Sequence, residues 1–214
     1  MKATLILANG SVFSGTSIGS TSDRVCEMVF NTSMTGYQEI LTDPSYAGQG
    51  IVMSYPLIGN YGVNHEDNES SRPWAEAFVV RHLSPIGSNF RCEETLDHYL
   101  KKHDITGIEG VDTRALTKIL RSQGSMNGMV TCAEHFNVAE ILEKLKAYRV
   151  EGTVERVSRK EPRGLPRLRR GEVQSGHDGL WREAEHDRVP APPGLPGDRA
   201  ARLHPRQGGP GRRL

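Results

Sequence analysis

Short apolar runs separated by polar turns dominate the first half of the chain. Residues 4–19, TLILANGSVFSGTSIG, form two such runs around Asn9-Gly10, a dipeptide typical of two-residue hairpin loops. Three further runs, rich in β-branched residues, follow at 25–30 (VCEMVF), 50–55 (GIVMSY) and 77–83 (AFVVRHL). The pattern predicts a β-hairpin followed by three more strands.

The chain then changes to helical spacing, in three segments: 94–103, 112–124 and 137–148. One face of each segment is apolar, through Leu96, Tyr99 and Leu100, then Leu116, Ile119 and Leu120, then Val138, Ile141, Leu142 and Leu145. Asp112 or Thr113 can cap the second helix and Gly124 can end it, while Asn137 and Glu140 resemble a capping box. Strands combined with helices predict an α/β domain over residues 1–155.

The composition changes sharply near residue 163. From Glu161 to Leu214 the chain contains no Lys, Ile, Phe, Met, Tyr, Asn, Thr or Cys, and Arg, Gly, Pro and Ala dominate. Such a segment has too little apolar material to offset the entropy of an ordered chain. We therefore expect a linker at 156–163 and a disordered tail at 164–214.

The tail also indicates a change of reading frame. Arg, Gly, Pro and Ala are the residues of GC-only codons, and the residues of AT-rich codons are the missing ones. When the tail is back-translated with free codon choice and read one nucleotide later, it can give peptides with helix and strand periodicity, among them MDYGAKRN from the region after His177. We hypothesise a frameshift just after Arg163, which would leave the tail without a designed function.

Charge and cysteine content exclude several classes of protein. Lys and Arg number 27 against 26 Asp and Glu, and this near-neutral balance does not favour nucleic acid or an anionic membrane as a partner. The Arg-rich tail could contact phosphates, but its interspersed acidic residues and frameshift signature argue against an RNA-binding protein. The first apolar run is too short for a signal peptide, so we expect a cytoplasmic protein with no membrane segment.

Cysteine and histidine spacing predicts neither a disulfide nor a metal site. Cys26, Cys92 and Cys132 are far apart and form no Cys-x-x-Cys pair, so we interpret them as reduced packing or surface thiols. His98 and His103 are five residues apart, which does not match the four-residue spacing of a helical metal pair. No metal ligand is predicted.

Polar side chains are unusually dense between the second and third predicted strand regions. Residues 31–49 read NTSMTGYQEILTDPSYAGQ and carry hydroxyls, amides and carboxylates at Asn31, Thr32, Ser33, Thr35, Tyr37, Gln38, Glu39, Thr42, Asp43, Ser45 and Tyr46. A loop needs turn residues, but it does not need this many groups able to bind a small polar ligand. Two interpretations stay open: a ligand site, or a turn with internal hydrogen bonds.

The same stretch belongs to a longer set of motifs that resembles a known family. With YPLIGNYGVN, ESSRPWAEAFVVRHLSPIGSNFR and IEGVDTRALTKILRSQGSMNG, it is similar to the amino-terminal domain of the small, glutamine-hydrolysing subunit of carbamoyl-phosphate synthetase, over residues 1–163. The resemblance implies a layered β/β/α domain. The alternate-frame peptide MDYGAKRN resembles the opening strand of the amidotransferase domain that follows in this family.

The resemblance also implies an activity that the visible sequence supports only in part. In the family, the small subunit hydrolyses glutamine, and a large subunit combines the ammonia with bicarbonate, using ATP and Mg, to make carbamoyl phosphate for arginine and pyrimidine synthesis. The catalytic Cys and His lie in the second domain, in GxCxGHQ-like and HPE-like motifs, and neither motif is present here. We therefore predict no catalytic residue and no cofactor in this chain, and inactivity when it is alone.

One residue of this chain matches a family site residue. The Ser of the DPSY segment contributes to the family's glutamine site where the two domains meet, and the matching position is Ser45. Pro44 restricts Asp43 to an extended conformation, which suits both a ligand site and a simple turn. For the other polar residues we expect structural or interface roles. The alternative function is a non-catalytic docking module for the large synthetase subunit.

Overall fold

The computed structural model describes residues 1–158. The predicted tail at 164–214, with the hypothesised frameshift, and residues 159–163 of the predicted linker lie outside the described residues. Within the described part, no helix is both long enough and apolar enough to cross a membrane.

Seven strands of the described part close into a barrel in the order β1-β2-β8-β6-β4-β3-β9. They are β1 (Lys2–Leu7), β2 (Val12–Gly19), β3 (Arg24–Asn31), β4 (Gln49–Met53), β6 (Ala77–Val79), β8 (Thr106–Glu109) and β9 (Met126–Thr131). Neighbours from β3 through β4 and β6 to β8 are parallel, and the other pairs are antiparallel. The α/β class is confirmed. The layered β/β/α arrangement is not confirmed, because the sheet returns on itself when β1 pairs with both β2 and β9.

The predicted hairpin is present, with Ile6 opposite Val12 and the turn at Asn9-Gly10. Gly10 has a φ of 87°, a conformation that glycine adopts without steric cost. The predicted strand over 77–83 is wrong as a single element. It divides into β6 and β7 (His82–Leu83), because the chain leaves the barrel after Val80 and pairs with β5 (Leu57–Ile58) instead.

All three predicted helices form, as α2 (Leu96–Lys102), α3 (Thr113–Gln123) and α4 (Val138–Ala147). Asp112 caps α3 by accepting from the Ala115 N–H at 3.0 Å. Asn137 caps α4 and also donates to the Glu140 side chain at 2.9 Å, as the capping-box pattern predicts. Short elements that the sequence analysis missed are α1 (Tyr37–Thr42), the 3-10 turn η1 (Pro44–Tyr46) and α5 (Thr153–Val157).

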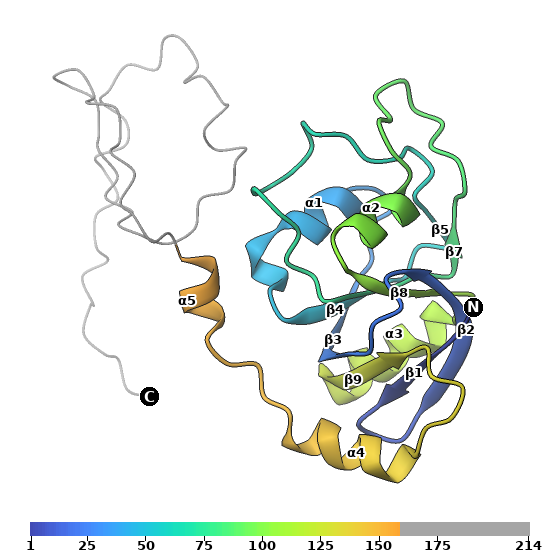
Figure 1. Ribbon diagram of the computed structural model, residues 1–214, viewed down its shortest axis with the longest axis vertical. Helices are drawn as coiled ribbons and strands as arrows, with labels where there is room; N and C mark the ends of the chain where they lie inside the picture. The colour runs from blue at the N-terminus through green and yellow to red at the C-terminus, as the bar shows by residue number, and fades with distance from the viewer. Residues whose placement is uncertain (159–214) are drawn as a thin grey trace, which may run out of the picture.

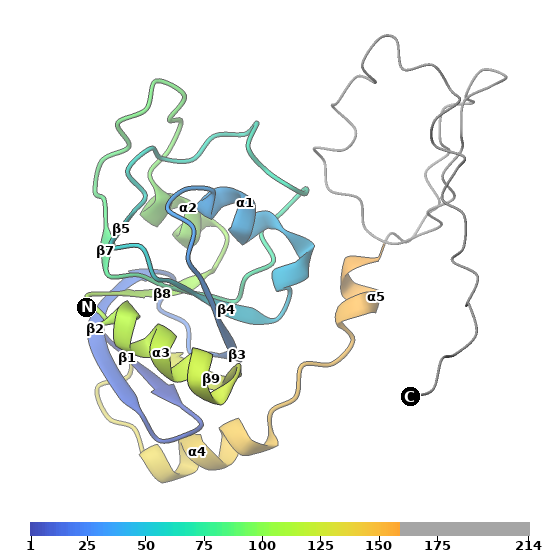
Figure 2. The same ribbon diagram turned by 180° about the vertical axis from the view of Figure 1, so that it is seen from behind.

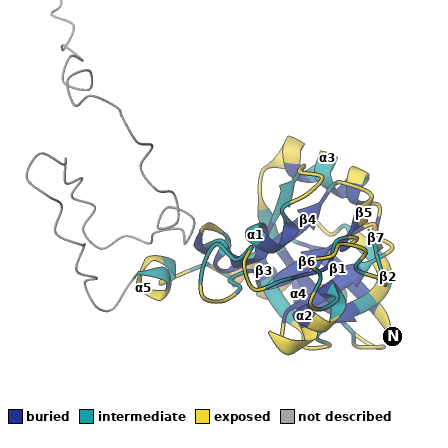
Figure 3. Cartoon of the chain, turned by 90° about the horizontal axis from the view of Figure 1, so that it is seen from above, coloured by how far each residue is buried: buried dark blue, intermediate teal, exposed yellow. Residues whose placement is uncertain are grey.

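Three apolar clusters hold these elements together. One lies between the barrel and the pair α1 and α2, a second joins the strands to α3, and a third seats Ile141 and Leu145 of α4 on β1 and β9. Figure 1 shows α1 and α2 above the barrel and α4 below it. Seen from behind, α5 stands apart from the barrel (Figure 2). Burial is concentrated in the strands and exposure in the outer loops (Figure 3).

Candidate functional site

Most polar side chains between β3 and β4 bond to the chain itself. The Tyr37 hydroxyl donates to the Gly62 carbonyl at 2.6 Å, and the Asn31 amide donates to the Tyr46 hydroxyl at 3.1 Å. The Thr42 hydroxyl donates to the Gln38 carbonyl and accepts from the Glu69 N–H. These bonds attach the loop at 59–76 to α1, so the internal-turn interpretation holds for these residues.

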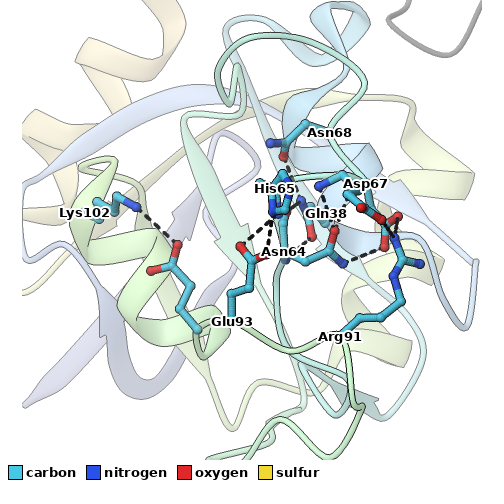
Figure 4. Close-up of polar contacts among 10 residues, drawn as sticks. Gln38, Asn64, His65, Asp67, Asn68, Arg91, Glu93 and Lys102 are labelled. Atoms are coloured by element: carbon cyan, nitrogen blue, oxygen red, sulfur yellow. Dashed lines mark hydrogen bonds and ion pairs between the residues drawn. The ribbon is translucent and has the colours of Figure 1, made fainter. Parts of the chain in front are cut away.

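Gln38 is the centre of this arrangement and is fully buried. Its Nε2 donates to the Asn64 carbonyl and, at 2.8 Å, to Asn68 Oδ1, while its Oε1 accepts from the Asn64 N–H at 3.0 Å. Figure 4 shows the Gln38 side chain enclosed by the loop that it holds. Since both ends of the amide are engaged, Gln38 fixes the loop and is not presented to a ligand.

Ion pairs at the surface of the same loop supplement this core. Arg91 donates to Glu66 at 2.8 Å and to Asp67 at 2.7 Å, and these carboxylates raise the pKa of the guanidinium. His65 pairs with Glu93 close by (Figure 4). Exposed pairs of this kind contribute little individually to the free energy of unfolding, because water screens them. The loop therefore depends chiefly on Gln38.

Two stacked tyrosines lie beneath the loop, with the Tyr37 and Tyr61 ring centroids 4.2 Å apart. The Tyr61 hydroxyl accepts from the Gly36 N–H at 2.6 Å. Burial raises the pKa of both phenols above the ordinary tyrosine value. Both therefore stay protonated at neutral pH, which argues against either as a general base.

Ser45 differs from its polar neighbours because it lies exposed in η1. Its backbone N–H donates to Asp43 Oδ1 at 2.7 Å, and the Ala47 N–H closes the turn on the Pro44 carbonyl at 3.1 Å. Asp43 is extended, as the following proline predicts. Within residues 1–158 the Ser45 hydroxyl has no hydrogen-bond partner, so the turn is complete without it and the hydroxyl faces solvent.

The three cysteines differ in burial but share an unreactive setting. Cys26 is fully buried beside Met28, and burial, with a contribution from Glu76, raises the pKa of its thiol to about 12. Cys92 is half-buried and donates to the Glu94 carbonyl, while Cys132 is half-buried and contacts the Ser17 hydroxyl. Among the described residues, none of the three sulfurs hydrogen-bonds to a histidine.

The two histidines of α2 have separate partners. His98 bonds to Glu94 at 2.6 Å, and His103 stacks on Tyr99 with ring centroids 4.5 Å apart. Burial and the nearby Lys102 lower the pKa of His103, which favours the neutral ring. Across residues 1–158 no three His, Cys, Asp or Glu side chains are grouped so that they could hold a metal ion.

An exposed apolar surface, not anticipated from the sequence, lies beside β5 and β7. Leu57 is 44% exposed, Ile86 69% and Phe90 96%. The segments that carry them are joined, since the Ser84 and Ser88 N–H groups donate to Ile58 and Asn60. We call Leu57, Ile86 and Phe90 the β5–β7 patch. Apolar residues isolated within the turn-rich sequence SPIGSNFR were the available signal.

Comparison with known proteins gives a single family. Residues 5–130 match the family model described as carbamoyl-phosphate synthase small chain, CPSase domain. The carbamoyl phosphate synthase small chain of Clostridium perfringens is 50% identical over 161 residues, which cover 75% of this chain and 46% of that protein. The small chain of Escherichia coli K12 is 50% identical over 146 residues, covering 68% and 38%.

A relative named for one pathway is similar to the same extent. The carbamoyl phosphate synthase pyrimidine-specific small chain of Halalkalibacterium halodurans is 46% identical over 167 residues, which cover 78% of this chain and 46% of that protein. The chain thus spans less than half the length of these curated relatives.

Proposed function

Since the chain belongs to the carbamoyl-phosphate synthase small-chain family, we propose that residues 1–158 are the amino-terminal domain of a subunit that hydrolyses glutamine and supplies ammonia for carbamoyl phosphate synthesis. The proposal includes the roles expected in the family: a cytoplasmic complex with a large subunit, ATP and Mg bound by that subunit, and service to arginine or pyrimidine synthesis. The observation that carries it at the residue level is the exposed Ser45 hydroxyl.

Ser45 is proposed to bind the amino-acid end of glutamine. A hydroxyl can donate to the carboxylate and accept from the ammonium group of that ligand. The Asp43–Ser45 backbone bond fixes the turn, so the hydroxyl is held in place before the ligand arrives. The Cys and His that carry out hydrolysis would come from another domain, because none of the three thiols described above has a histidine partner within residues 1–158.

The test requires the amidotransferase domain, which the hypothesised frameshift would separate from this one. In a protein read one nucleotide later after Arg163, we expect glutamine-dependent ammonia release. Ser45→Ala should then raise the KM for glutamine about twofold to tenfold, corresponding to a lost hydrogen bond of ~0.5–1.5 kcal/mol, with a smaller change in kcat.

Ser14→Ala is the matched control, because Ser14 is also an exposed hydroxyl but lies on β2. It should leave the KM for glutamine unchanged. An unchanged KM in the Ser45→Ala protein would reduce Ser45 to a turn residue. Resequencing the gene beyond the codon for Arg163 tests the frameshift independently of any assay.

A second candidate function, docking to the large subunit without catalysis, is favoured by the β5–β7 patch. Exposed aromatic and aliphatic side chains that cluster on one surface are typical of protein interfaces. A domain that binds its partner through part of a larger interface would bind more weakly than an intact small subunit, because less area is buried.

Phe90→Ala measures the contribution of this patch. In co-sedimentation with a purified large subunit, we expect the substitution to weaken binding about tenfold, the effect of removing a strong interface anchor. Val12→Ala should not change binding, because Val12 is also an exposed apolar residue, 47% exposed, but lies at the β1–β2 hairpin. Absence of any association at high micromolar concentration would contradict the docking function.

A further inference from the structure

After α4 the chain crosses the end of the barrel at which β4 and β6 begin. Its start is fixed by β9, because the Asn127 side-chain amide donates to the Tyr148 carbonyl at 3.0 Å. Two residues later, Val150 lies against Gly48, the residue immediately before β4. We call residues 148–157 the strap.

The far end of the strap is attached to the start of β6. Arg156 of α5 pairs with Glu76, immediately before β6, at 3.1 Å. The Glu76 N–H in turn donates to the Gln49 carbonyl at 2.8 Å, which connects this anchor to β4. Both side chains of the ion pair are partly exposed, so the pair guides the strap more than it stabilises it.

The contact between Gly48 and Val150 is more specific. Gly48 has a φ of +81°, and a Cβ built on it would lie 2.9 Å from Val150 Cγ1, closer than real Cβ contacts. Val150 therefore occupies the space that any other residue at 48 would need for its side chain. Gly10 offers a comparison: its φ is +87°, but a Cβ there would meet nothing within 4 Å.

Gly48 also belongs to the segment that presents Ser45. It follows Ala47, whose N–H closes the η1 turn on Pro44, and lies three residues after Ser45. We propose that Gly48 and Val150 are positioning residues that couple the strap to the Ser45 turn. The inference rests on the proposed function for the meaning of the Ser45 site, but the coupling is measured without glutamine.

The coupling works in both directions, since two elements that share a contact stabilise each other by the same free energy. A seated strap restricts the Ser45 turn, and an intact turn holds the strap across the barrel end. In all views α5 lies on the side of the molecule nearest the turn between α1 and β4 (Figures 1, 2 and 3). The chain therefore leaves the described domain beside the proposed ligand residue.

Trypsin cleavage after Arg149 and Arg156, followed by mass spectrometry of the full chain, measures seating of the strap. Cleavage requires local opening of the segment, so its rate reports how often the strap leaves the barrel. Gly48→Ala should accelerate cleavage at both sites about tenfold, through loss of the Val150 contact. Gly10→Ala is the control, since it imposes a positive-φ strain without a neighbour.

Two further results separate coupling from simple loss of stability. The double variant Gly48→Ala with Val150→Ala should be cleaved no faster than the more sensitive single variant, because both substitutions remove one contact. Val150→Ala should also accelerate amide exchange of Ser45, measured by NMR, by about threefold or more, although position 150 is distant in sequence.

Multiplied cleavage rates in the double variant, equal acceleration by Gly10→Ala, or an unchanged Ser45 amide would each overturn the inference. None of these results bears on whether Ser45 binds glutamine. That question is answered by the KM for glutamine of the Ser45→Ala protein, so the two proposals fail separately.

Discussion

A protein of these 214 residues should release no ammonia from glutamine above background. Amide hydrolysis of this type needs a thiolate activated by a nearby His. The pKa of Cys26 is raised to about 12 by burial, so its thiolate is scarce at neutral pH. Cys92 and Cys132 are half-buried and bond to a backbone carbonyl and a serine hydroxyl. Ser45 cannot substitute, because its hydroxyl contacts no base within residues 1–158.

The assay compares this chain with the frame-restored protein at the same concentration, with a coupled enzyme that reports ammonia. We expect a signal only from the frame-restored protein. Ammonia release by the shorter chain that disappears on replacing Cys92 or Cys132 by Ser would show that the chemistry resides in the present domain, contrary to our proposal. Replacing Cys26 is less informative, since a fully buried side chain also supports the barrel.

Local patterns predicted the elements whose contacts are near in sequence. The hairpin at Asn9-Gly10 and the caps at Asp112 and Asn137 depend on residues within a few positions, and all three are confirmed. Closure of the barrel depends on β4, β6 and β8, which have three to five residues each and pair across long connections. Runs this short carry little periodicity, so the sequence could not indicate that they form one closed sheet.

The candidate site divides in the same way. The sequence revealed that residues 31–49 are rich in polar groups, but it could not tell which of them bond to the chain. Gln38 finds its partner Asn64 26 positions away, and Tyr37 finds Gly62 25 positions away. Ser45 was selected by family resemblance, and its exposure is compatible with that role. The β5–β7 patch was missed because exposure of Phe90 is a property of the folded surface.

Replacing Gln38 therefore should affect stability far more than replacing Ser45. Gln38→Ala removes a fully buried amide and leaves the Asn64 N–H and carbonyl without their partners. We expect the free energy of unfolding to fall by ~2–4 kcal/mol, since buried polar groups that lose their hydrogen bonds are costly. Ser45→Ala should change it by less than about 0.5 kcal/mol, as exposed substitutions usually do.

Urea unfolding measures both changes, with a lower midpoint and an unchanged m-value expected for Gln38→Ala. Gln123→Ala is the matched control, because Gln123 is an exposed glutamine at the end of α3 that bonds only to the Asn9 side chain. It should behave like Ser45→Ala. If Gln38→Ala were as stable as Gln123→Ala, the loop at 59–76 would not depend on the buried amide, and the polar density of residues 31–49 would again require a ligand as its explanation. A large loss from Gln38→Ala beside an unperturbed Ser45→Ala would separate the two kinds of polar residue in this stretch: those that build the loop and the one that is free to bind.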